Sequence, residues 1–362
     1  MTEVCHAGRT HVNRNARTRD RKRGPKPRSI QAMKRTSKVV KPIGLLPRPS
    51  ANGARKRVPR GGAALALVQF APSKGDVDAN LASIGAALAT LKRDRGAFPD
   101  VVVFPEACLS GYFVEGGVRE VAIAAPELLR RLRATAAKAL GASHRPFDIV
   151  VGFYEDGGGK LYNSALYATL GKSAVIRHVH RKLFLPTYGV FDEERFVSRG
   201  RSIEAFDTPH GRAAILICED ACHSLATTIV ALRGAQILYI PSASPGRGLA
   251  DAEPANVRMW RDIARVVAAE HGIFVAYAGL LGFEGGKGFT GSSRLVGPFG
   301  DLRAEAPFDA PAILRVDIYD DDLAAARAAL PLLGDLESNL AELVAMIDEE
   351  AAQRPRAKRA GR

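Results

Sequence analysis

Three residues that could perform chemistry each stand where a short apolar run ends. They are a cysteine, Cys218, a glutamate, Glu106, and a lysine, Lys182. A thiolate can attack a carbonyl carbon, a carboxylate can move the proton, and an ammonium can stabilise the oxyanion that forms. The three side chains together would suit acyl transfer, if the fold brings them to one place.

Cys218 ends the run Ala-Ala-Ile-Leu-Ile-Cys and is followed by Glu-Asp. The pattern predicts a strand that turns into a helix, with the sulfur protruding at the turn and the helix N-terminus favouring the thiolate. The alternative is a buried structural cysteine, which is common at the end of an apolar strand.

Glu106 directly follows an apolar strand, where burying a carboxylate is costly unless it is paired or functional. A desolvated glutamate has a raised pKa and can serve as general base and then as general acid. Lys182 leads into a loop with proline and glycine, from which it could donate to an oxyanion. For each residue taken singly, a structural alternative stays open. Glu106 could be an exposed carboxylate at a strand end, and Lys182 could be a surface lysine.

The elements that must position these residues alternate along the chain. Short β-branched runs predict buried strands, and longer segments between them predict helices. The predicted strands are Ala64–Ala71, Asp100–Phe104, Phe147–Tyr154, the hairpin Leu161–Leu170 with Ala174–Lys182, Ala213–Cys218, Ile237–Ile240, Ile273–Ala278, Thr290–Gly300 and Ala312–Ile318. The predicted helices are Val77–Arg93, Val118–Leu140, Ser224–Arg233, Pro254–His271, Asp320–Ala329 and Leu336–Glu350. This alternation indicates one α/β domain with layered sheets.

The charge of the chain is concentrated in its first residues. Residues 1–60 carry 18 Lys and Arg against 2 Asp and Glu, whereas the whole chain has a net charge of +14, so the remainder sums to about −2. We predict a disordered basic extension over 1–62, a folded domain over 63–335, and a C-terminal helix with a basic tail over 336–362. The extension could make a weak nucleic-acid contact, but the balanced body argues against a dedicated nucleic-acid-binding domain.

The composition also indicates the cellular location and the cofactors that we expect for the protein. The chain has 4 cysteines in 362 residues, too few for a disulfide scaffold, which favours a reducing, cytoplasmic location. No apolar run is long enough to span a bilayer, and we expect no membrane association. Cys222 and His223 follow Cys218, but no second Cys/His pair stands nearby, so we expect neither a metal nor an organic cofactor.

Three ordered blocks resemble the nitrilase, or carbon–nitrogen hydrolase, superfamily. They are FPEACLSGY around Glu106, HRKLFLPTYGVFDEERF around Lys182, and LICEDAC around Cys218. The resemblance covers roughly residues 63–318. Within the superfamily, the sequences of these blocks are most similar to the glutaminase domain of glutamine-dependent NAD synthetase. The chain ends before a synthetase domain and has no SGG-type phosphate loop, so we expect that it does not make NAD by itself.

The resemblance implies a four-layer α-β-β-α sandwich that forms a homodimer or higher homo-oligomer. It implies Glu106 as general base, Lys182 as oxyanion stabiliser and Cys218 as nucleophile, with Glu193 orienting the lysine. It also implies a substrate pocket, whose matching residues are Tyr112, Tyr188, Glu219 and, less directly, Ser244.

The sequence therefore predicts a hydrolase of carbon–nitrogen bonds that cleaves a small carboxamide, such as glutamine or an ω-amide. A nitrilase is the second interpretation, since the same thiol can add to a nitrile carbon. A third belongs to another class: a basic-tailed nucleic-acid-binding protein in which these residues are scaffold. Ammonia release, thiol labelling and salt-sensitive RNA binding separate the three.

Overall fold

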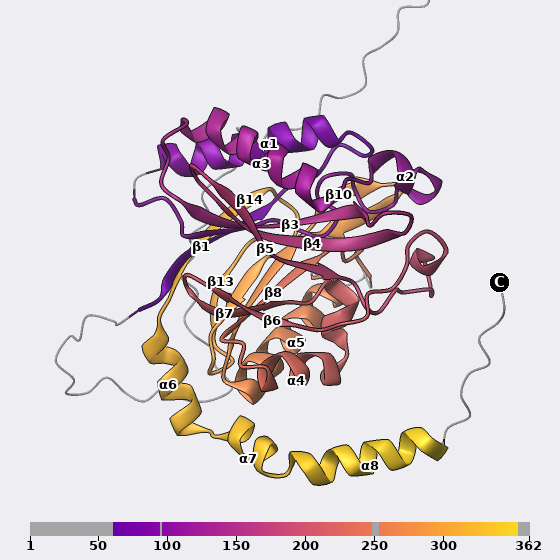
Figure 1. Ribbon diagram of the computed structural model, residues 1–362, viewed down its shortest axis with the longest axis vertical. Coiled ribbons are helices and arrows are strands. Elements are labelled where there is room, and N and C mark those ends of the chain that lie inside the picture. Colours follow the sequence, from indigo (N-terminus) through magenta and orange to yellow (C-terminus); the bar gives the residue numbers. More distant parts are fainter. Residues whose placement is uncertain (1–60, 95, 248–252, 354–362) are drawn as a thin grey trace, which may run out of the picture.

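Two six-stranded sheets pack face to face in the computed structural model, which describes residues 61–94, 96–247 and 253–353 (Figure 1). The first sheet has the order β14-β1-β2-β3-β4-β5, in which β1, β2 and β3 are parallel and the other pairs are antiparallel. Its strands are β1 (Ala63–Gln69), β2 (Val101–Val103), β3 (Phe147–Asp156), β4 (Leu161–Leu170), β5 (Ala174–Arg181) and β14 (Ala312–Ile318).

The second sheet repeats this plan with the order β13-β12-β9-β8-β7-β6. Its central strands β7, β8 and β9 are parallel, and antiparallel strands flank them. The strands are β6 (Ala205–Thr208), β7 (Gly211–Ile215), β8 (Ile237–Ser242), β9 (Phe274–Gly279), β12 (Arg294–Val296) and β13 (Leu302–Glu305). A separate hairpin joins β10 (Leu281–Glu284) to β11 (Lys287–Thr290).

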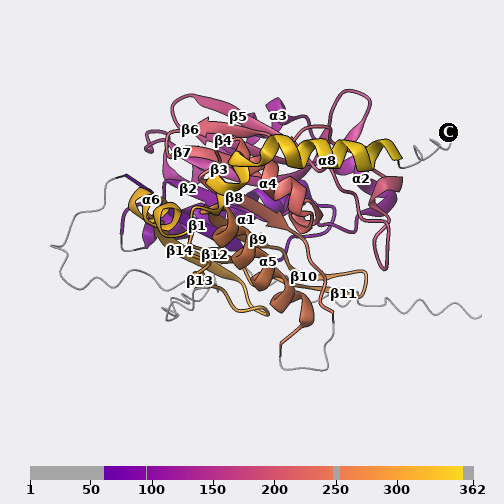
Figure 2. The same cartoon turned by 90° about the horizontal axis from the view of Figure 1, so that it is seen from below.

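Helices cover the outer face of each sheet. The first sheet carries α1 (Val77–Arg93) and α3 (Ala125–Leu140), and the second carries α4 (Ser224–Leu232) and α5 (Ala255–His271) (Figure 2). One apolar core fills the space between the sheets, and one lies beneath each helical layer. The predicted four-layer α-β-β-α sandwich is therefore confirmed.

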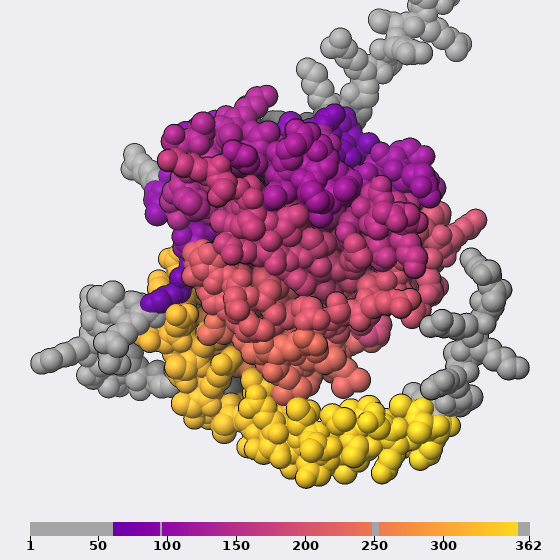
Figure 3. Space-filling view, in the orientation of Figure 1, coloured from indigo at the N-terminus to yellow at the C-terminus, as the bar shows by residue number. Residues whose placement is uncertain are grey.

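The C-terminal segment forms an arm whose first two helices contact this sandwich and whose last helix stands off from it (Figures 1 and 3). It consists of α6 (Asp320–Ala329), α7 (Leu332–Ser338) and α8 (Leu340–Gln353). The helix predicted over Leu336–Glu350 is present as α8, but it begins later, because the chain breaks at Asn339, between α7 and α8.

Other predicted elements are also divided. The helix predicted over Val118–Leu140 is interrupted after α2 (Val118–Val121), where Ile123 bridges to Glu155 and Pro126 opens α3. Of the strand predicted over Thr290–Gly300, Thr290 ends β11, Arg294–Val296 form β12, and a turn follows β12. Strands β6, β10, β11 and β13 were not predicted, and short 3₁₀ helices occur at η2 (Glu115–Gly117), η3 (Glu193–Arg195) and η4 (Cys218–Cys222).

The predicted extension over 1–62 lies almost entirely outside the described residues, as does the basic tail from 354 to 362. Of the helices in the described part of the chain, none has the length and apolar character needed to cross a bilayer.

Candidate active site

Loops from both sheets bring the three predicted residues together. Glu106 follows β2 and Lys182 follows β5, both in the first sheet, whereas Cys218 follows β7 in the second. The Ala243 N–H, just after β8, donates to Glu106 Oε2 over 2.6 Å and so crosses between the sheets. The site therefore lies at the seam of the sandwich, which is why residues far apart in sequence can converge.

Lys182 lies between two carboxylates. Its Nζ is 2.7 Å from Glu106 Oε1 and 2.8 Å from Glu193 Oε2, and the residue is only 1% exposed. Burial by itself would lower the pKa of Lys182, but the charges of Glu106 and Glu193 outweigh it and hold that pKa well above its usual value. The lysine is therefore an ammonium, and Glu193 lies where an orienting residue would.

The Glu106 carboxylate is fully buried and accepts three hydrogen bonds. Two reach Oε1, from Lys182 and from Asn163 Nδ2 at 2.8 Å, and one reaches Oε2, from Ala243. Burial raises the pKa of Glu106, the Lys182 charge lowers it, and the nearby Glu193 raises it again, with a net increase. A carboxylate with a raised pKa is a stronger base, and Oε2 keeps a lone pair for a proton.

Cys218 begins η4 with a φ of 44°, in the left-handed region that few residues other than glycine adopt. The residue is partly exposed, and its sulfur lies close enough to the buried Glu106 and Lys182 to feel the charge of both. Desolvation of the sulfur and the charge of Glu106 raise the pKa of Cys218 well above the usual range. The sequence predicted that a helix N-terminus would favour the thiolate; the helix that begins at Cys218 is only the five-residue η4, and the shift in the pKa of Cys218 runs in the opposite direction.

Two predicted substrate-binding residues meet at the rim of the site. Tyr188 Oη donates to Glu219 Oε2 over 2.8 Å, and the Arg247 guanidinium lies 5.8 Å from the Tyr188 ring and 5.6 Å from the Phe191 ring. Tyr188 and Arg247 form part of the wall of a cavity of about 1280 Å³, which does not include Cys218. The rim thus carries a cation, a carboxylate and an aromatic ring.

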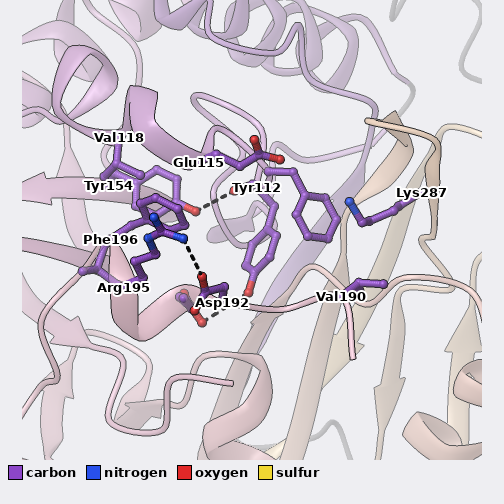
Figure 4. A pocket seen from close by; sticks show the side chains of 12 residues that line it. Tyr112, Glu115, Val118, Tyr154, Val190, Asp192, Arg195, Phe196 and Lys287 are labelled. Atoms are coloured by element: carbon purple, nitrogen blue, oxygen red, sulfur yellow. Dashed lines mark hydrogen bonds and ion pairs between the residues drawn. The ribbon is translucent and has the colours of Figure 1, made fainter. Parts of the chain in front are cut away.

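The other two predicted residues lie deeper. Tyr112 is buried, with its hydroxyl 3.2 Å from Glu193 Oε2 and its ring centre 5.6 Å from Lys182 Nζ. It lines a smaller cavity of about 270 Å³, together with Tyr154 and Glu193 (Figure 4). Ser244 is buried and accepts a hydrogen bond from Asn256 Nδ2 at 3.1 Å. The four predicted substrate-binding residues therefore do not line a single pocket in the structure.

Asn163 is a member of the site that the sequence reasoning missed. Its Nδ2 donates to Glu106 and also to Glu193, so this amide bridges the two carboxylates that contact Lys182. The available signal was an asparagine within the apolar hairpin strand, where a buried amide needs partners. Its Oδ1 is buried and has no hydrogen-bond partner within the part of the chain that the structure describes.

No three His, Cys, Asp or Glu side chains among residues 61–94, 96–247 and 253–353 are arranged to hold a metal ion. The donors around Cys218 are instead the amine and carboxylates described above. The expectation that the chemistry needs no cofactor stays a prediction.

Comparison with known proteins matches residues 64–328 to the carbon–nitrogen hydrolase family model. Among curated relatives, glutamine-dependent NAD(+) synthetase of Xylella fastidiosa Temecula1 is 29% identical over 278 residues, covering 76% of this chain and 47% of that protein. Omega-amidase NIT2 of Danio rerio is 27% identical over 282 residues, covering 76% of this chain and 95% of that protein. The chain thus spans about half the length of the synthetases that it matches.

Solved structures give the same picture. A mutant amidase from Nesterenkonia sp. AN1, which carries the acetamide moiety of fluoroacetamide covalently at its active-site cysteine, superposes with a TM-score of 0.61 at 25% identity. The match covers 80% of this chain and 99% of the amidase. A carbon–nitrogen hydrolase from Helicobacter pylori G27 superposes with a TM-score of 0.65, also at 25% identity, over 76% of this chain and 94% of that one.

Proposed function

Because the chain belongs to the carbon–nitrogen hydrolase family, we propose that it hydrolyses a small carboxamide through a thioester on Cys218 and releases ammonia. It is a hydrolase of carbon–nitrogen bonds; the amide substrate and the thioester are the proposal. One observation carries it: Lys182 contacts Glu106 and Glu193 directly, at the seam where Cys218 is partly exposed.

In the first half of the reaction, Glu106 accepts the proton of Cys218 as the sulfur attacks the amide carbon. The carbonyl oxygen becomes an oxyanion, which the Lys182 ammonium stabilises together with a backbone N–H near Glu219. An oxyanion donor of this kind contributes about 3–4 kcal/mol. Since the pKa of Cys218 is raised, the proton leaves the sulfur during attack and not before it.

In the second half, the protonated Glu106 returns its proton to the amide nitrogen. The carbon–nitrogen bond breaks, ammonia leaves, and the acyl group remains on sulfur as a thioester. Glu106, again a carboxylate, takes a proton from water, and the hydroxide attacks the thioester carbon. The carboxylic acid departs and Cys218 regains its proton, so no oxidant, reductant or metal enters the balance.

The rim supports an acyl group that carries its own charges. Arg247 is suited to a carboxylate, and Glu219, held by Tyr188, is suited to an ammonium or a donor group. Among the relatives, one is named as a glutamine-dependent synthetase and another as an omega-amidase. We therefore favour a glutamine-like or ω-amide substrate over a simple aliphatic amide.

A panel of substrates with matched variants tests the proposal. Ammonia release is measured for glutamine, ω-amides of dicarboxylic acids, neutral aliphatic amides, carbamoyl compounds and nitriles. Cys218→Ala should lower the rate by orders of magnitude and leave the fold intact, as judged by circular dichroism. Cys222→Ala is the matched control, because this exposed cysteine lies on the same short helix and should leave the rate unchanged.

Each outcome of the panel has a definite meaning. Release from amides but not nitriles supports the amidase, and acid formation from nitriles alone would make the protein a nitrilase. Wild-type activity in Cys218→Ala would end the proposal. The cytoplasmic location, the transfer of ammonia to a partner enzyme and the nucleic-acid contact of residues 1–60 stay predictions that this panel does not address.

A further inference from the structure

The buried Asp220 side chain has a role that the proposed reaction does not use. It lies two residues after Cys218 and is 0% exposed. Its carboxylate is surrounded by N–H donors from two separate segments of the chain. Four hydrogen bonds occupy all the acceptor positions that an ionised carboxylate offers.

Two of these hydrogen bonds come from the loop that follows the catalytic lysine. The N–H groups of Leu183 and Phe184 each donate to Asp220 Oδ1 over 2.9 Å. Leu183 is the residue directly after Lys182, so this oxygen fixes the backbone from which the lysine side chain starts.

The other oxygen fixes the turn that carries the nucleophile. The N–H of Ile217, directly before Cys218, donates to Asp220 Oδ2 over 3.1 Å. His180 Nε2, on β5 and only 1% exposed, lies 2.8 Å from the same oxygen. Asp220 thus joins the strand that presents Lys182 in the first sheet to the turn that presents Cys218 in the second.

A ring contact reinforces this connection. The Phe184 ring stacks on His223, with centroids 3.8 Å apart and an interplanar angle of 19°. His223 directly follows η4, so the same two segments are held at both ends of the short helix.

We propose that Asp220, supported by His180, is a positioning residue that sets the separation between the Lys182 ammonium and the Cys218 sulfur. Reactions of this kind are sensitive to misplacement, since a shift of about 1 Å can cost about 10²-fold in rate. This inference rests on the proposed function, because it assumes that lysine and sulfur act on one carbonyl group.

The test begins with Asp220→Asn. Asparagine keeps one oxygen for Leu183 and Phe184, but it replaces Oδ2 by an NH₂ group that faces the Ile217 N–H. We expect kcat to fall on the order of 10²-fold while KM changes little. The rate of Cys218 alkylation by iodoacetamide should fall as well, and this measurement needs no substrate.

A second pair of variants separates positioning from folding. His180→Leu removes the donor to Asp220 and should lower kcat and the alkylation rate. His180→Gln can still donate from its amide and should restore most of both. Asp148→Asn is the matched control: Asp148 is equally buried, at 1% exposure, but accepts hydrogen bonds from Tyr167 and Thr169. It should lower the melting temperature without changing kcat or alkylation.

Two results would overturn the inference. One is wild-type kcat and alkylation in both Asp220→Asn and His180→Leu. The other is a loss of kcat and alkylation rate in Asp148→Asn equal to that in Asp220→Asn when the two variants have the same melting temperature. That result would show that global stability sets the rate. If the wild-type protein releases no ammonia from any amide, the proposed function fails instead, whereas the alkylation rates still report on the position of the sulfur.

Discussion

The charge arrangement around Lys182 determines how the site depends on pH. One ammonium faces two carboxylates in a site from which water is largely excluded, so the cluster keeps one excess negative charge. Burial raises the pKa of Glu106 and the pKa of Cys218, and a neighbouring carboxylate adds to each increase, Glu193 for Glu106 and Glu106 for Cys218. The base is therefore strengthened while the thiol stays protonated, an arrangement that favours proton transfer during attack.

The raised pKa values predict the shape of the pH profile. The reaction needs ionised Glu106, so kcat/KM should fall with decreasing pH, with an acid limb above the ordinary glutamate value of 4.5. Lys182 and Cys218 both keep their protons through neutral and mildly alkaline pH, so the rate should stay level up to about pH 9.

Glu193→Gln provides the internal check on that profile. The charge of Glu193 raises the pKa of Glu106, so its removal should move the acid limb to lower pH. Steady-state rates for wild type and variant over pH 4–10 give both limbs. An acid limb that moves upward in Glu193→Gln would contradict this account of the charges.

At the scale of the elements, the sequence predicted the ends of the strands better than their arrangement. Glu106, Lys182 and Cys218 do follow β2, β5 and β7, because an apolar run that stops at a polar residue marks the point where a buried strand ends. Periodicity does not tell which sheet a strand joins, so the seam between two sheets could not be foreseen.

Contacts that depend on tertiary structure were the ones that sequence reasoning missed. Asn163 and Asp220 each form hydrogen bonds to groups from other elements. The break before α3 has the same origin, since Ile123 leaves the helical pattern to pair with Glu155 on β3. Local propensity carries no information about such partners.

At the scale of the whole molecule, the C-terminal arm and the α4–α5 layer present apolar side chains to solvent. On α8 these are Leu343, Val344, Met346 and Ile347, with exposed fractions of 39–60%. On α4 and α5 they are Leu225, Ile229, Met259 and Val266. Apolar surface of this kind is typical of an interface between subunits. We propose that a second copy of the chain covers it, as the family resemblance leads us to expect.

Charge substitutions on this surface test the dimer. Val266→Glu on α5, or removal of residues 330–362, should convert a dimer into a monomer in light scattering coupled to size exclusion. Val175→Glu is the control, because Val175 is similarly exposed at 44% but lies on β5, at the edge of the other sheet. A wild-type protein that is monomeric at every concentration would refute the proposal.

The most direct test of the central claim is the identity of the residue that carries the acyl group during turnover. The reaction with the best amide from the panel is quenched in acid after a few milliseconds and digested, and the peptide that contains Cys218 is examined by mass spectrometry. The account predicts an added mass equal to the substrate minus ammonia on Cys218, lost on treatment with hydroxylamine. Ammonia release with no adduct on Cys218, or with the adduct on Cys108 or Cys222, would contradict it.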